Sequence, residues 1–170
     1  MRLLIILLTL AISLPSRAAV EITNFRSGLA CTETKLTEDG SGWICQPTED
    51  VLVTDQGVCE FNGTEKPCTW IGFEFDYKGA RRGAKLQCVS ETSAPVDAGN
   101  PEQLIAKDAS SQPYELELKS ESGHFFNPQY FVFGVHSKGS ETLVNTGHCK
   151  SEGQIVFEYR FNIRFPTVAE

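Results

Sequence analysis

Hydrophobic and polar residues alternate one by one over much of the chain, which is the repeat of a β-strand. The clearest example is residues 157–165, where every odd position is aromatic or aliphatic and every even position is charged or an amide. A helix would mix these two sets, whereas a strand sends them to opposite faces. The segment therefore predicts a strand of an antiparallel sheet with one buried and one solvated face.

Other segments predict strands by the same pattern. Residues 69–77 place Ile71, Phe73 and Phe75 on one face, and residues 129–136 are apolar on both faces, which is typical of a central strand. The remaining predicted strands are residues 51–54, 57–61, 84–92, 114–119 and 143–149. About ten short strands predict an all-β fold, an antiparallel β-sandwich, with a closed β-barrel as the alternative.

Two dipeptides predict turns between these strands. Asn62-Gly63 is a strong hairpin signal, and we expect a four-residue loop over residues 62–65 that places Cys59 directly opposite Cys68. Asn127-Pro128 also predicts a turn, with the aromatic residues beside it closing one end of the core. Asn62 also begins an Asn-Gly-Thr sequon, whose glycosylation depends on the host.

Residues 93–113 differ from the rest of the chain because they contain no aromatic residue and three prolines. Within this stretch, Asn100, Pro101 and Glu102 have the order of a helix N-cap, a first-position proline and an acidic first turn. We therefore expect at most one short helix, from Pro101 to about Asp108.

The chain has six cysteines, an even number that predicts a disulfide framework in an oxidising compartment. No two form a Cys-x-x-Cys pair, so we expect no metal site, and no motif indicates a cofactor. Only Cys149 lies beyond residue 113, so complete pairing must join the two halves, which favours one domain over residues 19–170. Sequence leaves 15 pairings open. The pairing we predict is Cys31–Cys45, Cys59–Cys68 and Cys88–Cys149.

The first 18 residues have the order of a signal peptide: a basic residue, an apolar run over residues 3–14 and small residues at Ser16 and Ala18. The run is shorter than the roughly 20 residues that a membrane-spanning helix needs. We expect export to a periplasm or the extracellular space, without a membrane anchor. Removal of this leader leaves 13 basic and 22 acidic residues, a net charge of −9. This charge repels nucleic acid and anionic lipid, so we expect a glycan or a protein as partner.

Candidate binding chemistry gathers on one face of residues 69–77. Trp70, Glu74 and Asp76 share the face opposite the apolar one, with Gly72 between them. An exposed indole stacks on sugar rings and carboxylates accept hydrogen bonds from hydroxyls, so these three residues predict a ligand-binding platform for a glycan. The alternative is that Trp70 is partly buried at a sheet edge and the acids are only solvated.

The same carboxylates predict a second function, hydrolysis of polysaccharide. The string Glu74-Phe75-Asp76 is similar to the Glu-x-Asp element of some β-sandwich glycosidases, which carry a further glutamate where Tyr77 and Lys78 follow here. A retaining mechanism needs two carboxyl groups about 5–5.5 Å apart, one of them with a raised pKa. Three histidines, none at a metal-ligand or triad spacing, are the other candidates: His124, His136 and His148.

Three functions therefore remain open. The first is an exported, non-enzymatic binding module that recognises a glycan or a protein. The second is the polysaccharide hydrolase that would use Glu74 and Asp76. The third is an acidic inhibitor or immunity-type protein that caps a cationic enzyme, which follows from the net charge alone. No catalytic residue is assigned beyond the second hypothesis, because the sequence contains no nucleophile motif such as Gly-x-Ser-x-Gly.

Overall fold

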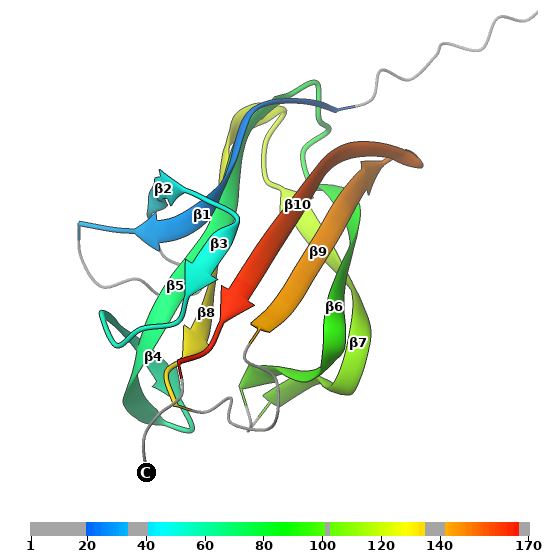
Figure 1. The fold of residues 1–170 in the computed structure, drawn as a ribbon. Helices are drawn as coiled ribbons and strands as arrows, with labels where there is room; N and C mark the ends of the chain where they lie inside the picture. Colours follow the sequence, from blue (N-terminus) through cyan, green and yellow to red (C-terminus); the bar gives the residue numbers. More distant parts are fainter. Residues whose placement is uncertain (1–19, 34–40, 101–102, 135–141, 167–170) are drawn as a thin grey trace, which may run out of the picture.

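The computed structural model describes residues 20–33, 41–100, 103–134 and 142–166, and for residues 98–100 and 103–106 it describes the backbone alone. These residues form ten strands and no helix, arranged as two packed sheets (Figure 1), so the predicted all-β, disulfide-stapled sandwich is confirmed. The predicted leader lies outside the described residues. The strands are β1 (Glu21–Cys31), β2 (Trp43–Pro47), β3 (Asp50–Leu52), β4 (Gly57–Phe61), β5 (Thr64–Lys78), β6 (Ala84–Asn100), β7 (Gln103–Leu118), β8 (Ser122–Val132), β9 (Thr142–Ser151) and β10 (Gln154–Arg164).

Sheet A is built around β5 and contains β1, β2, β4, β5 and β8. β5 pairs antiparallel with β1 over residues 71–78 and with β8 over residues 68–78, so β1 and β8 lie on opposite sides of it. β4 forms a hairpin with the start of β5, and β2 extends the sheet beyond β1. β5 therefore has neighbours on both sides and carries the predicted site through the middle of this sheet.

Sheet B has the strand order β3–β10–β9–β6–β7. Its pairs are antiparallel except that β3 runs parallel to β10, a departure from the fully antiparallel prediction. The alternation predicted for residues 157–165 is observed, because Phe157, Tyr159 and Phe161 are buried. Glu158 and Arg160 are exposed on the opposite face. One face of sheet B therefore covers the core and the other faces solvent.

Aromatic rings from the two sheets meet in the core. Phe157 of β10 lies with its ring centroid 4.9 Å from that of Phe25, 5.3 Å from that of Phe73 and 5.0 Å from that of Phe75. Each such pair adds about 0.5–1.5 kcal/mol beyond the burial of its area. This interdigitated layer fixes β5, and with it the residues that β5 carries on its other face.

The predicted helix from Pro101 to Asp108 is wrong. Residues 103–108 belong to β7, and the long β6–β7 ladder includes the pairs Asn100↔Gln103 and Gly99↔Leu104. Pro101 and Glu102 lie outside the described residues. The N-cap-like order is a local preference, and the cross-strand pairing of two long strands overrides it.

The predicted turn at Asn127-Pro128 is also wrong, because both residues lie inside β8 opposite Phe73 and Gly72. A proline has no N–H for a ladder, but it is tolerated in an edge strand. β8 pairs only with β5 among the described strands, so one of its sides is an edge. β7, the outer strand of sheet B, likewise carries Pro113 within its length.

Two strands escape the sequence patterns altogether, β1 and β2. The register of β1 against β5 shifts between Thr23 and Arg26, so a β-bulge breaks the two-residue period of β1. Asn24 within the bulge has a φ of 52°, a left-handed conformation that asparagine adopts more readily than most residues. β2 is short, and Ile44 is its one buried residue.

All three predicted disulfides are present: Cys31–Cys45, Cys59–Cys68 and Cys88–Cys149. The predicted four-residue loop after β4 is wrong, because Phe61 pairs directly with Thr64 across a two-residue turn. Asn62 and Gly63 both have positive φ in that turn, as a type I′ hairpin requires. Cys59 is therefore opposite Lys66 rather than Cys68, and its disulfide runs diagonally across the ladder.

Candidate functional site

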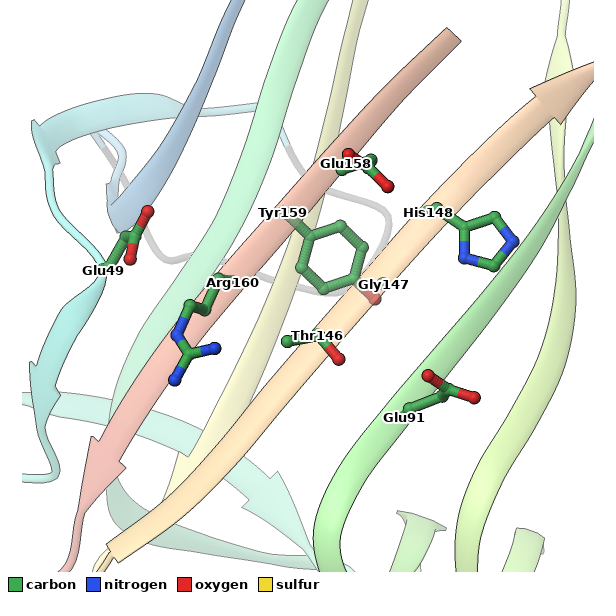
Figure 2. A pocket seen from close by; sticks show the side chains of 8 residues that line it. All are labelled: Glu49, Glu91, Thr146, Gly147, His148, Glu158, Tyr159 and Arg160. Carbon is green, nitrogen blue, oxygen red and sulfur yellow. The ribbon is translucent and has the colours of Figure 1, made fainter. Parts of the chain in front are cut away.

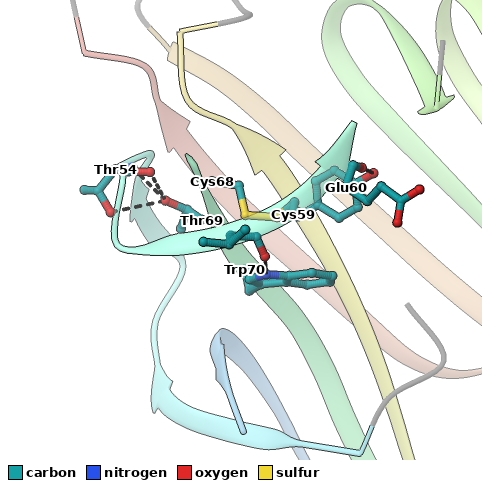
Figure 3. Close-up of a disulfide and its surroundings, with 8 residues drawn as sticks. Thr54, Cys59, Glu60, Cys68, Thr69 and Trp70 are labelled. Carbon is teal, nitrogen blue, oxygen red and sulfur yellow. Dashed lines mark hydrogen bonds between the residues drawn. A yellow bond between two sulfur atoms is a disulfide. The ribbon is translucent and has the colours of Figure 1, made fainter. Parts of the chain in front are cut away.

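Trp70 is buried, with 8% of its surface exposed. Its indole N–H donates a hydrogen bond to the carbonyl oxygen of Val58 at 3.1 Å, and its ring centroid lies 5.0 Å from that of Tyr130. The ring packs beside the Cys59–Cys68 disulfide in a small hydrophobic cluster (Figure 3). The indole therefore presents no open face on which a sugar could stack. It is buried on β5, the strand with neighbours on both sides, so the alternative of a partly buried residue at a sheet edge does not describe it either.

Close backbone approaches explain why the outer face of sheet A is covered. A Cβ added to Gly72 would lie 2.3 Å from the carbonyl oxygen of Asn127, on the neighbouring strand β8. A Cβ added to Gly28 would lie 2.1 Å from the carbonyl oxygen of Gln46, on β2. Only glycine allows these approaches. They bring the neighbouring chain segments over the outward positions of β5.

Glu74 is almost fully buried, at 2% exposure, although it lies on the face predicted to be solvated. The guanidinium group of Arg26 donates two hydrogen bonds to its Oε1, one of them from Nε at 2.7 Å. Its Oε2 accepts the backbone N–H of Ile44 at 2.9 Å. Both oxygens of the carboxylate are therefore held by partners from β1 and β2, which satisfies a charge that burial would otherwise make costly.

Asp76 lies two residues further along β5 and is about half exposed. Its Oδ2 accepts a hydrogen bond from the side-chain amide of Asn24 at 2.7 Å, and its Oδ1 lies 3.0 Å from Nδ1 of His124. The Asn24 amide, followed by the His124 ring, holds the pKa of Asp76 below its ordinary value, because both groups stabilise the carboxylate. Asp76 is therefore ionised at neutral pH.

The structure brings Glu74 and Asp76 together with Asn24 and Arg26, which the sequence did not indicate, and with His124, a candidate histidine that the sequence did not connect to the acids. We call these five residues the sheet A network. The bulge in β1 places both Asn24 and Arg26 on the network, and His124 faces Asp76 across the β5–β8 ladder. These partners lie 48 or 52 residues from the acids in sequence. The register of β1 and β8 against β5 is what identifies these partners. That register is known only once the fold is known.

The sheet A network is poorly suited to acid–base catalysis. A retaining glycosidase needs one carboxyl group that is protonated near neutral pH, and the lowered pKa of Asp76 works against that. Both oxygens of Glu74 already accept protein N–H groups. Within the described ranges, no three His, Cys, Asp or Glu side chains gather as ligands for a metal ion. The network therefore fits a role in joining strands.

The outer face of sheet B carries a second candidate, an open depression that we call the sheet B depression (Figure 2). The β9–β10 ladder places Glu158 opposite His148 and Arg160 opposite Thr146, and the β6–β9 ladder places Glu91 beside Thr146. Its polar lining residues come from four segments and are Glu49, Glu91, Thr146, His148, Glu158 and Arg160. In contrast to β5, nothing within the described chain covers these positions.

The lining of the sheet B depression is charged and mostly exposed. Three carboxylates, from Glu49, Glu91 and Glu158, stand against one guanidinium group, that of Arg160. Arg160 donates from Nε to the side-chain oxygen of Asn162 at 3.1 Å. Sequence reasoning placed the even positions of residues 157–165 on a solvated face but assigned them no role. The alternation of these residues placed them on one face of a strand. It did not show which strands would pair beside that strand and complete the depression.

The other predicted histidine positions are separated. His124 belongs to the sheet A network and His148 lines the sheet B depression, so these two lie on the outer faces of different sheets. His136 lies outside the described residues. The two described histidines therefore do not converge on one centre.

No protein-family model matches the sequence, and no curated protein matches it. Among the described residues, no helix is long and apolar enough to cross a bilayer.

Proposed function

We propose that this protein is an exported, non-enzymatic binding module that contacts a cationic protein partner through the sheet B depression. The observation that carries the proposal is the open, predominantly acidic lining of that depression on the outer face of sheet B (Figure 2). Carboxylates arranged over such a face attract a basic surface and orient it during encounter.

The contrast with the sheet A network supports a binding role over a catalytic one. Glu74 and Asp76, the pair required by the hydrolase hypothesis, already have protein partners for their carboxylate oxygens. The glycan hypothesis depended on an exposed Trp70, and that indole is packed against Tyr130 and a disulfide. A glycan platform on this face therefore has no support from the side chains that were predicted to form it.

The overall charge supports a cationic partner. Without the predicted leader the chain carries a net charge of −9. An acidic protein of this size, stapled by three disulfides, suits an inhibitor or immunity-type role against a basic enzyme. Export is supported by the signal-peptide order of the first residues and by the disulfides themselves, which persist in oxidising compartments.

The test measures binding of the mature chain to lysozyme, a basic secreted hydrolase, with polylysine as a probe of non-specific attraction. The double variant Glu91→Gln/Glu158→Gln replaces two carboxylates of the depression with neutral amides of nearly the same size. The single variant Glu60→Gln, at an exposed position on β4, is the control. Titrations at 50 and 300 mM salt separate charge attraction from other contacts.

We expect measurable binding of lysozyme at 50 mM salt that weakens steeply at 300 mM. The double variant should weaken it about five- to tenfold, as expected for two exposed charge pairs, and Glu60→Gln should leave it unchanged. Equal loss in both variants, or polylysine binding as tight as lysozyme binding, would contradict a specific role for the depression. Binding of a neutral polysaccharide that the double variant retains would favour the glycan hypothesis instead.

A further inference from the structure

The three disulfides differ in their exposure to solvent. Two of them lie inside the protein, because four cysteines are no more than 2% exposed: Cys59, Cys68, Cys88 and Cys149. In the third bridge, Cys45 is exposed and Cys31 is partly exposed. Thiol–disulfide exchange requires that a thiolate reach one of the two sulfur atoms of a bridge. The folded protein therefore presents one bridge to a reductant and shields the other two.

An exposed tryptophan lies beside this bridge. In the β1–β2 ladder Cys31 pairs with Trp43, which is 40% exposed. Trp43 and Cys45 are two residues apart in β2, so they point to the same side of the strand, whereas Ile44 points to the other side and is fully buried. A large amphipathic ring of this kind is a frequent contact for a protein partner. The exposed bridge and the indole therefore form one surface.

The same bridge holds β2 in place. β2 is five residues long and pairs only with β1 among the described strands. It nevertheless buries Ile44 and donates the N–H of that residue to Oε2 of Glu74 at 2.9 Å. The bridge joins cysteines 14 positions apart, and closing a loop of that size shifts the balance between attached and detached forms by about a hundredfold. The attachment of β2 to the sheet A network therefore depends on the oxidised bridge.

We propose that Cys31–Cys45 is a thiol–disulfide exchange site for a dithiol protein that docks over Trp43, and that reduction loosens β2 from the outer face of sheet A. This inference is independent of the sheet B depression and of any partner bound there.

The exchange has two steps. A thiolate of the dithiol attacks Sγ of Cys45, the more exposed sulfur, which forms a mixed disulfide and releases Cys31 as a thiolate. The second thiolate of the dithiol then attacks the dithiol's own sulfur in the mixed disulfide, which releases Cys45. The dithiol is oxidised to a disulfide, and its two electrons reduce the bridge. The two protons that the dithiol gives up to water are matched by two that the released cysteines take.

The first experiment treats the mature, folded protein with reduced thioredoxin, a dithiol protein, and separately with dithiothreitol. Alkylation blocks the thiols that form, and peptide mass spectrometry locates them over time. We expect Cys31 and Cys45 to be labelled at least about tenfold faster than the four buried cysteines. Labelling of a buried pair first, or of all six cysteines at one rate, would overturn the exchange site.

The docking contact is tested by Trp43→Ala in the same assay. This variant should slow reduction by thioredoxin about three- to tenfold, the size of a moderate interface contact, and leave reduction by dithiothreitol unchanged. Ile155→Ala is the matched control, since Ile155 is an exposed apolar residue on sheet B, and it should alter neither rate. Equal rates for Trp43→Ala and the wild type with thioredoxin would overturn docking over Trp43.

The loosening of β2 is measured by amide hydrogen exchange. In Cys31→Ser/Cys45→Ser the Ile44 amide should exchange about a hundredfold faster than in the wild type, while the amides of β10 keep their rates. If this variant folds poorly, wild-type protein in which dithiothreitol has reduced only the exposed bridge gives the same measurement. An unchanged rate at Ile44 in the reduced protein would overturn the loosening.

Discussion

The outer faces of the two sheets carry similar alternating patterns but have opposite environments. On β5 the outward positions include Trp70 and Glu74, and both are buried. On β10 the outward residues Glu158 and Arg160 are exposed. The difference arises because β2 and β8 approach the outer face of sheet A at Gly28 and Gly72, whereas the described chain leaves the outer face of sheet B open.

The contrast shows that two properties of a strand are distinct: which residues share a face, and whether another segment covers that face. Alternation tells which residues share a face, because side chains on a strand point to opposite sides in turn. It does not tell whether another segment covers that face. An acid on a covered face needs partners from neighbouring strands, whereas an acid on an open face has water and is free to meet a ligand.

The largest expected effect is on stability, and it comes from replacing one arginine on each outer face with alanine. Arg26→Ala leaves the carboxylate of Glu74 buried without its ion-pair partner, a change that costs about 3 kcal/mol of unfolding free energy. Arg160→Ala on the open face should change that free energy by no more than about 0.5 kcal/mol. Urea unfolding at pH 7 measures both. Similar values for the two variants would contradict the contrast between a covered and an open face.

The next effect concerns the close approach that covers sheet A. Gly72→Ala places a Cβ against the backbone oxygen of Asn127, which cannot move without separating β5 from β8. We expect a loss of about 2–3 kcal/mol, the usual range for overpacking. Gly147→Ala in sheet B meets the ring of Tyr159, which is buried and stacked on Phe73, so a comparable loss is expected there. Thermal unfolding measures both losses, and a loss below about 1 kcal/mol at Gly72 would argue against the close approach.

A smaller effect should appear in acid. The lowered pKa of Asp76 means that its contribution to stability is present above the ordinary carboxyl range and is lost as the pH falls through the lower, folded value. Asn24→Gly removes the amide donor while keeping the positive φ accessible, so the pKa of Asp76 should rise towards its ordinary value. NMR titration of the carboxyl groups measures this shift. Glu115, whose pKa is lowered by Lys85 and Gln87 on sheet B, should titrate unchanged.

The smallest effect is expected for Glu158→Gln on the open face. This carboxylate is exposed, so the substitution should change the unfolding free energy by no more than about 0.5 kcal/mol. Its consequence should instead be seen in salt-dependent binding of a basic protein. A large loss of stability in this variant would mean that the open face has a structural role comparable to that of sheet A.

The fold was predictable where local patterns and pairing agree. The alternation of residues 157–165 identified β10. The predicted disulfide pairing is present, although the sequence left 15 pairings open and the register predicted for Cys59 and Cys68 was wrong. The fold was not predictable where tertiary pairing overrides a local signal. The order Asn100-Pro101-Glu102 favours a helix, yet the β6–β7 ladder continues to Asn100, and the bulge at Asn24 hides β1 by shifting its period.

The candidate sites were likewise predictable only in part. The shared face of Trp70, Glu74 and Asp76 follows from their spacing in one strand and is observed. Their burial and their partners depend on β1, β2 and β8, which reach them only through sheet register. The sheet B depression likewise combines residues of β6, β9 and β10, so no single segment of sequence contains it.

The edge strands of the two sheets also affect whether copies of the protein associate at high concentration. Among the described strands, β7 and β8 are the long strands at sheet edges, and each contains a proline, while β2, β3 and β4 are only three to five residues long. A second chain that tried to add a strand at Pro113 or Pro128 would find no N–H there to continue the ladder. Addition of a strand from another molecule is therefore interrupted at these prolines, and we expect the protein to remain dispersed at concentrations where an uninterrupted edge would seed fibrils.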